Sequence, residues 1–185
     1  TITTSYVYGL STTPKDRNAG DTRNYSRHYR QRLRAEVLLD AVTDITGVTE
    51  KFTAMPPGSR AMSMWTVRAA SEFLDSFGRP DPNQDPPCER TTDTTVVQAL
   101  HLMNSANLHR KVTADNGRAA KLATSKKTPT EIVNELYLLA YCRLPAAEEL
   151  SKAVRHFEKH GANRREVTED LLWALVNTPE FVFND

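Results

Sequence analysis

The chain has 185 residues, of which 39% are hydrophobic and 25% charged, and its formal net charge is +1. This composition is typical of a folded globular domain and excludes a disordered chain. A net charge this close to zero provides no positive field that would attract nucleic acid, so we expect a single domain over residues 1–185 and no nucleic-acid partner.

The sequence predicts no membrane-spanning segment. No uninterrupted apolar run approaches the roughly 20 residues that a spanning helix needs. The opening stretch TITTSYVYGL lacks the basic and apolar regions of a signal peptide. Export stays open at this point, because a leader would have been cleaved and the chain could be a fragment of a longer protein.

The first strong helical pattern follows an irregular N-terminal stretch. In RAEVLLDAVTDITG the apolar residues recur at helical spacing and Gly47 provides a stop, which predicts a helix over residues 34–47. A Pro-Pro-Gly turn follows. Apolar and polar residues alternate over residues 61–65, which is compatible with one short strand. A further apolar stripe that ends at a glycine predicts a short helix over residues 66–77.

The second half of the chain carries most of the helical signal. A helix is predicted over residues 94–111 with Thr92 or Asp93 as its N-cap, and GRAAKLA predicts a short helical turn. The next helix, TPTEIVNELYLLAYC, begins with a capping box and has a proline in its first turn. Its predicted inward residues are Ile132, Val133, Leu136, Leu139 and Ala140.

Two more helices complete a compact C-terminal unit of three helices. The first starts after Pro145, and its predicted inward residues are Leu150, Ala153, Val154 and Phe157. The second is capped by Asn163, and its predicted inward residues are Val167, Leu171, Ala174 and Leu175. The predicted fold class is therefore all-α, a multi-helix domain with irregular segments around residues 48–90.

Two clusters of charged residues have both functional and ordinary interpretations. RNYSRHYRQRLR interleaves arginines with Tyr25, His28 and Tyr29, as an anionic-glycan surface could, but a solvated approach to the first helix is the favoured interpretation. His156 and His160 have the spacing of a two-histidine metal site. Because RHFEKHG is basic and lacks HExxH, we expect no metal site there.

No complete catalytic motif occurs in the sequence, and we expect no catalytic residue. Neighbouring acids such as Glu148 and Glu149 are expected to cap or solubilise helices, and no base can be assigned to Cys88. Cys88 could be structural, bonded to Cys142, or reactive. Cys142 ends an apolar helix face, where a buried inert thiol is common. Without a CxxC or CxxCH motif we expect neither zinc nor covalent haem in this chain.

A series of short motifs occurs in a fixed order between Ser5 and Asn184: SYVYGLS, NYSRHY, RLRAEVLLDAVTDITGV, PPGSRAM, FLDSFGRP, CERT, QALHLMNS, EIVNELYLLAYCRLPAAEEL and DLLWALVNTPEFVFN. In this order they resemble the planctomycete-specific surface domain of unknown function. The resemblance singles out as interaction or motif residues Asn24, Tyr25, Arg27 and His28 of NYSRHY, and Cys88, Glu89 and Arg90 of CERT.

The resemblance implies that this chain is the C-terminal part of a longer exported polypeptide, located in the periplasm or at the cell surface. Members of that family usually carry an upstream cytochrome c-like domain, so a c-type haem is expected there and no cofactor in this chain. The family motif around CERT reads Cys-x-Cys-Glu-Arg, and Pro86 occupies the place of the first cysteine. This departure weakens any redox or metal role for Cys88.

Together these features predict a non-catalytic scaffold or interaction domain. Its expected partners are upstream domains of the same polypeptide or other subunits of an assembly. One alternative is a contribution to an oxidoreductase or electron-transfer assembly, with the haem edge near NYSRHYR or CERT. Another is a cell-surface glycan-binding module, which would need exposed aromatic side chains such as Trp65 or Tyr29 beside the arginines.

Overall fold

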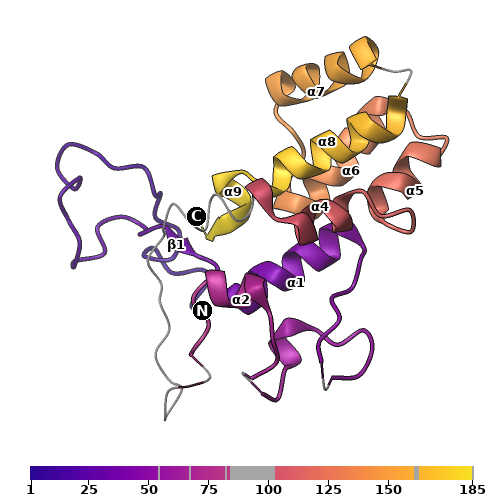
Figure 1. The fold of residues 1–185 in the computed structure, drawn as a ribbon. Helices are drawn as coiled ribbons and strands as arrows, with labels where there is room; N and C mark the ends of the chain where they lie inside the picture. Colours follow the sequence, from indigo (N-terminus) through magenta and orange to yellow (C-terminus); the bar gives the residue numbers. More distant parts are fainter. Residues whose placement is uncertain (54, 67, 82, 84–102, 161–162, 185) are drawn as a thin grey trace.

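The computed structural model describes residues 1–53, 55–66, 68–81, 83, 103–160 and 163–184. These residues form a helical domain with one short pair of strands, which confirms the predicted all-α class (Figure 1). The elements are β1 (Gln31–Arg32), α1 (Ala35–Thr46), the 3-10 turn η1 (Ala61–Ser63), α2 (Glu72–Ser76), α4 (Ala106–Val112), α5 (Arg118–Thr124), α6 (Pro129–Tyr141), α7 (Ala147–His160), α8 (Arg164–Val176), α9 (Pro179–Val182) and β2 (Phe183–Asn184).

Helix α1 is the centre of the hydrophobic core and confirms the helix predicted over residues 34–47. It contacts α2, α4, α5, α6 and α8. Its side chains Leu38, Leu39 and Val42 are almost completely buried. The helix ends at Gly47, whose left-handed φ of 69° lets its N–H donate to the carbonyl of Thr43.

Residues 61–65, for which the sequence allowed one short strand, contain the 3-10 turn η1 instead. Asp40 on α1 is buried, and its carboxylate accepts hydrogen bonds from the N–H groups of Ala61 at 2.7 Å and Met62 at 3.1 Å. Because one carboxylate holds two successive N–H groups, the chain curls at this point rather than extending. This contact between residues far apart in the sequence anchors the irregular segment to α1.

One predicted helix is shorter than its apolar stripe suggested, and a second is interrupted within its described residues. Helix α2 begins only at Glu72, because the Ser71 side chain accepts from the N–H of Leu74 and caps it there. The helix predicted over residues 94–111 is interrupted at Ser105, which caps α4, and α4 extends to Val112. The proposed N-cap of that helix, at residue 92 or 93, lies outside the described residues.

The C-terminal unit of α6, α7 and α8 is confirmed, and so is the short helix before it, α5. The capping box of α6 is complete: Glu131 N–H donates to Thr128 Oγ1 at 3.3 Å, and Thr128 N–H donates to Glu131 Oε2 at 2.6 Å. Helix α7 lies on the outer side of α8 in Figure 1 and contacts both α6 and α8. Of its predicted inward residues, Phe157 is buried and the other three are half-buried.

The predicted inward faces of α6 and α8 need correction. Leu139 is exposed, because the side of α6 that packs on the neighbouring helices carries Ile132, Val133, Leu136 and Tyr137 instead. On α8, Val167 and Leu175 are buried as predicted, but Leu171 is half-buried and Ala174 is exposed. The buried face of α8 is rotated because α5 packs along this helix, and its remaining buried members are Thr168, Leu172 and Val176.

The first 33 residues, here called the N-terminal segment, extend away from the helices as an irregular chain (Figure 1). Strand β1 at its end pairs antiparallel with β2, with Gln31 opposite Asn184 and Arg32 opposite Phe183. This pairing joins the N-terminal segment to the end of the chain. Among the described helices, none is long and apolar enough to cross a bilayer.

Candidate functional site

Residues 21–29 form an ordered turn, here called the Asp21 turn, inside the N-terminal segment. The Asp21 carboxylate accepts hydrogen bonds from the hydroxyl and N–H of Ser26, from the N–H of Arg23 at 3.0 Å and from the N–H of Asn24 at 2.9 Å. These donors, the Ser26 hydroxyl first, hold the pKa of Asp21 well below its usual range. The ionised carboxylate thus organises the turn.

The Asp21 turn presents Tyr25 to solvent in a conformation that side chains rarely adopt. Tyr25 has φ 53° and is 63% exposed, and its N–H donates to the Tyr29 hydroxyl at 3.0 Å. The two rings lie 5.3 Å apart, and the Arg27 guanidinium lies 5.2 Å from the Tyr29 ring centre. Tyr29 itself is half-buried.

The structure therefore brings the motif residues Asn24, Tyr25, Arg27 and His28 into one turn. Asn24 donates its side-chain amide to Asp21 at 3.2 Å, and the N–H of His28 donates to the carbonyl of Ser11 at 3.1 Å. The second group of motif residues, Cys88, Glu89 and Arg90, lies outside the described residues.

The expectation of a buried thiol at the end of α6 is wrong. Cys142 is an exposed free cysteine, and it occupies the C-cap position of α6 with a left-handed φ of 54°. The buried face of this helix ends at Tyr137, one turn earlier, so the cap residue turns toward solvent. The disulfide with Cys88, one of three alternatives for that residue, involves a partner outside the described residues.

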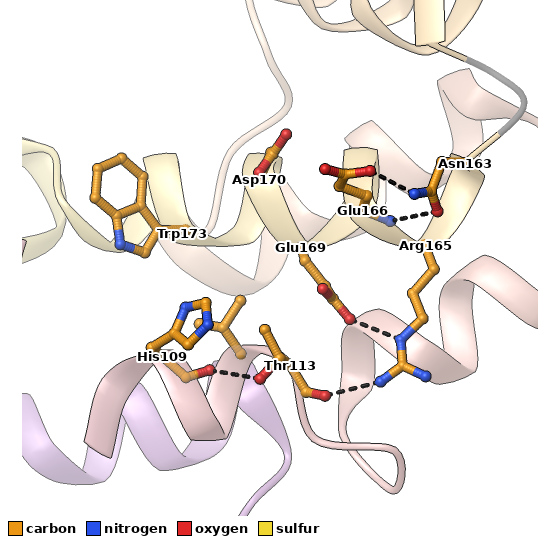
Figure 2. A pocket seen from close by; sticks show the side chains of 9 residues that line it. His109, Thr113, Asn163, Arg165, Glu166, Glu169, Asp170 and Trp173 are labelled. Carbon is orange, nitrogen blue, oxygen red and sulfur yellow. Dashed lines mark hydrogen bonds and ion pairs between the residues drawn. The ribbon is translucent and has the colours of Figure 1, made fainter. Parts of the chain in front are cut away.

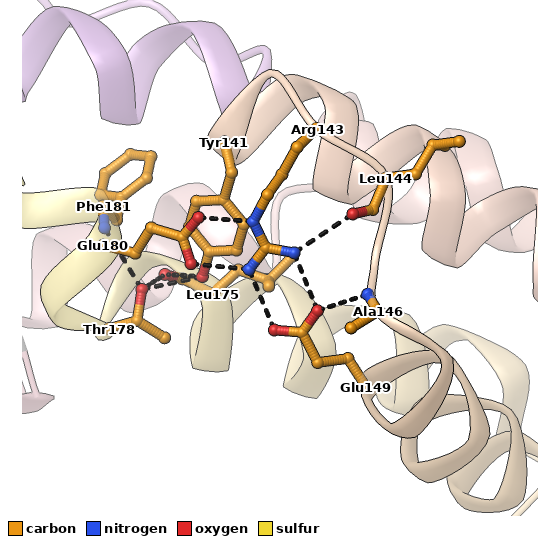
Figure 3. Close-up of polar contacts among 9 residues, drawn as sticks. All are labelled: Tyr141, Arg143, Leu144, Ala146, Glu149, Leu175, Thr178, Glu180 and Phe181. Atoms are coloured by element: carbon orange, nitrogen blue, oxygen red, sulfur yellow. Dashed lines mark hydrogen bonds and ion pairs between the residues drawn. The ribbon is translucent and has the colours of Figure 1, made fainter. Parts of the chain in front are cut away.

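A network around Arg143, here called the Arg143 clasp, ties the turn between α6 and α7 to α9 (Figure 3). Arg143 donates to both oxygens of Glu149 at 2.8 and 3.0 Å and to both oxygens of Glu180 at 2.7 and 2.8 Å. Its guanidinium also lies 5.6 Å from the Tyr137 ring centre and 5.4 Å from that of Tyr141. The bonds from Arg143 lower the pKa of Glu149 to about 2.

Beneath the clasp, the Tyr141 hydroxyl is shared between two polar partners. It donates to the carbonyl of Leu175 at 3.1 Å and lies 2.8 Å from the Thr178 hydroxyl. Burial raises the pKa of Tyr141 to about 12, so the phenol stays neutral. Sequence reasoning missed the whole clasp, because Arg143 and Glu180 are far apart in the chain. Its role is structural.

Two cavities flank α8. The first, of about 610 Å³, lies between α6, α7 and α8, and its lining is mostly apolar, with the side chains Tyr137, Ala153, Phe157, Leu171 and Trp173. The second, of about 680 Å³, lies between α4 and α8 and is more polar, with His109, Thr113, Asn163, Arg165, Glu166 and Glu169 in its wall (Figure 2). Asp170 and Trp173 belong to the walls of both cavities.

The histidine pair that raised the question of a metal lies beside the first cavity. The rings of His156 and His160 are 4.9 Å apart, and His156 Nε2 lies 3.6 Å from Asp170 Oδ2. Within the ranges of the chain that the structure describes, no three His, Cys, Asp or Glu side chains are grouped to hold a metal ion.

The fold and these surfaces define an all-α domain with two cavities and an ordered, tyrosine-bearing turn. The PSD1 family model, described as a protein of unknown function (DUF1553), matches residues 1–157, which is most of the chain. The chain therefore belongs to the PSD1 family. No curated protein and no solved structure matches it.

Proposed function

We propose that this PSD1 domain is a non-catalytic interaction domain whose N-terminal segment docks onto a neighbouring domain or subunit. The observation that carries the proposal is the exposure of large apolar side chains along that segment. They are Ile2 at 78%, Tyr6 at 85%, Val7 at 55%, Tyr8 at 58% and Tyr25 at 63%. Soluble surfaces seldom gather such side chains unless a partner covers them.

The residue types of the N-terminal segment support protein recognition. Tyrosine and arginine are the side chains that most often dominate protein interfaces, because each combines a large contact area with a polar group. The segment carries both, with Arg27 stacked on Tyr29 inside the Asp21 turn. Because the turn already holds Tyr25 in an uncommon backbone conformation, docking would cost less ordering entropy there.

The proposal extends to the context of the domain. The motif resemblance to the planctomycete-specific surface domain supports a location outside the cytoplasm, in the periplasm or at the cell surface. It also supports a place at the C-terminal end of a longer polypeptide with a c-type haem in an upstream domain. In this account the N-terminal segment packs against that upstream part or against another subunit of the assembly.

The test is native purification followed by mass determination, visible absorption and cross-linking. We expect a polypeptide much heavier than 20.8 kDa, a c-type Soret band, and cross-links from Lys15 to residues outside this chain. A haem-free protein of the mass of this chain alone would contradict the cytochrome context. Cross-links from Lys15 that stay within the helices would contradict the docking role.

A glycan-binding module is the second candidate, and one observation favours it. Trp65 is 69% exposed and Tyr25 is 63% exposed, so each offers a ring face to a sugar. The chain has two tryptophans, so a Trp173→Phe variant leaves Trp65 as the sole tryptophan, and its fluorescence reports binding there. Saturable quenching of that variant by soluble polysaccharide would favour glycan binding over protein docking.

A further inference from the structure

Three aromatic rings from three different helices line the cavity between α6, α7 and α8. Tyr137 comes from α6, Phe157 from α7 and Trp173 from α8. Helix α7 only partly covers this space, since Phe157 is its single buried side chain among the described residues of that helix. The volume of about 610 Å³ falls in the range of sites for small organic molecules.

The charged side chains around this cavity differ in whether an opposite charge is paired with them. Glu149 has both oxygens bonded to Arg143, and Lys152 is paired with Glu148 at 2.7 Å. Asp170 differs from Glu149, because its ion-pair contact is the His156 imidazole at 3.6 Å, which is charged only when protonated. Among the described residues, Asp170 thus has no permanently charged cation as its ion-pair partner, and it lies at the edge of an aromatic cavity.

The wall of the second cavity also carries more negative than positive side chains. Glu169 is neutralised by Arg165 at 2.7 Å, whereas Glu166 is held by the neutral side-chain amide of Asn163 (Figure 2). Asp170 therefore adds to an acidic wall there too. Trp173 stands one turn further along α8 than Asp170, and both side chains line both cavities.

An indole and an unbalanced carboxylate in the wall of one cavity supply the chemistry that recognises an organic cation. The face of tryptophan attracts cations more strongly than any other side-chain ring, and a carboxylate supplies the opposite charge. A bare metal ion would need more oxygen or nitrogen ligands than these residues bring together. An anionic ligand would be repelled by Asp170 and Glu166.

We propose that Asp170 and Trp173 form a binding site for an organic ammonium ion whose apolar body occupies the cavity between α6, α7 and α8. The cationic group lies against the Trp173 ring and the Asp170 carboxylate. The apolar body packs on Tyr137, Phe157 and Leu171. The site does not depend on the N-terminal segment, so it is independent of the proposed docking function.

The test uses three probes with the same phenyl body and different charge: benzyltrimethylammonium, benzyl alcohol and benzoate. A Trp65→Phe variant leaves Trp173 as the sole tryptophan, and its fluorescence reports binding at the site. We expect saturable quenching by benzyltrimethylammonium with a Kd about tenfold lower than that of benzyl alcohol. Benzoate is expected to bind more weakly than either.

Two substitutions assign the binding to the carboxylate. Asp170→Asn should raise the Kd of benzyltrimethylammonium about tenfold, to that of the neutral probe. The matched control is Glu158→Gln, which removes one exposed carboxylate from α7 outside both cavities and should leave the Kd unchanged. Circular dichroism shows whether each variant keeps its helices.

Three results would overturn the proposal. They are an absence of saturable binding by benzyltrimethylammonium, equal affinity for the charged and neutral probes, and an unchanged Kd in a folded Asp170→Asn variant. If Asp170→Asn does not fold, the preference of the parent variant for the ammonium over the alcohol decides the question alone.

Discussion

The helical body, α1 to α9, and the N-terminal segment, residues 1–33, are built on opposite principles. In the body, the side chains of Leu38, Leu136 and Leu172 are completely buried, and α1, α6 and α8 each pack on several other helices. In the segment, the largest apolar side chains face solvent, and order comes from local polar bonds such as those to Asp21. Hydrophobic burial stabilises the body but contributes little to the segment.

We therefore assign the stability of the domain to the helical body and the recognition of a partner to the N-terminal segment. The segment exposes five large apolar side chains within 33 residues, whereas the six that the described part of the body exposes are spread over residues 62–144. The two-residue pairing of β1 with β2 and the bond from Leu33 N–H to the carbonyl of Val182 join the segment to the body. Substitutions in the body should therefore change folding, and substitutions in the segment should change binding.

The largest expected effect is in the core. Leu172→Ala removes a fully buried side chain of α8 and should lower the free energy of unfolding by about 2 to 5 kcal/mol, because it leaves a cavity at a site packed by α5. Urea denaturation followed by circular dichroism measures this. A loss below about 1 kcal/mol would mean that α8 is not a core helix.

The Arg143 clasp should come next. Arg143→Gln leaves Glu149 and Glu180 close together without their shared cation, and we expect a loss of about 1 to 2 kcal/mol at neutral pH, limited by solvent screening. The control is Arg155→Gln, an exposed arginine of α7 whose side chain bonds only its own helix. Equal losses in the two variants would contradict a role for the clasp.

The clasp also predicts an acid dependence of stability. Because the folded-state pKa of Glu149 is lowered from 4.5 to about 2, its contribution is present above pH 4.5 and is lost as the pH falls toward 2. Stability measured over this range should fall less steeply in Arg143→Gln than in the parent chain. Parallel pH profiles would show that Arg143 does not set the pKa of Glu149.

The capping box of α6 should have a smaller effect. Thr128→Ala removes the acceptor for the Glu131 N–H and should lower the free energy of unfolding by about 1 kcal/mol. Thr130→Ala, an exposed position one residue inside the helix, serves as the control. In thermal denaturation, the Thr128→Ala variant should have a clearly lower midpoint temperature than the Thr130→Ala variant.

The smallest effect on folding belongs to the N-terminal segment. A Tyr6→Ser, Tyr8→Ser double variant should change the free energy of unfolding by less than about 0.5 kcal/mol, because both rings face solvent. The same variant should weaken attachment to the partner. A large loss of stability would mean that the segment belongs to the core of this domain.

The parts of the fold that sequence predicted are those set by local chemistry. The apolar periodicity of α1 and the capping box at Thr128 lie within a few residues, so each could be recognised without tertiary information. The buried face of α8 could not, because its orientation depends on α5 packing beside Leu172. The turn at Ala61 likewise depends on Asp40, which lies far back along the chain.

The candidate sites were even less accessible to sequence reasoning. NYSRHY singled out residues that the structure brings into one turn, but nothing in that motif indicates the left-handed backbone of Tyr25. The two cavities depend on the spacing of α4, α7 and α8, which no single segment encodes. Nothing in the sequence marks Asp170, because its relation to Trp173 is seen only when both side chains line the same cavities.

The most direct test of the docking claim is backbone hydrogen exchange of the N-terminal segment. Amide exchange over residues 1–33 is compared between the 185-residue chain alone and the same residues in the natively purified protein. We predict fast exchange in the isolated chain and strong protection in the native protein, with the helical body equally protected in both. Equally fast exchange of residues 1–33 in both samples would contradict the claim that this segment is an interface.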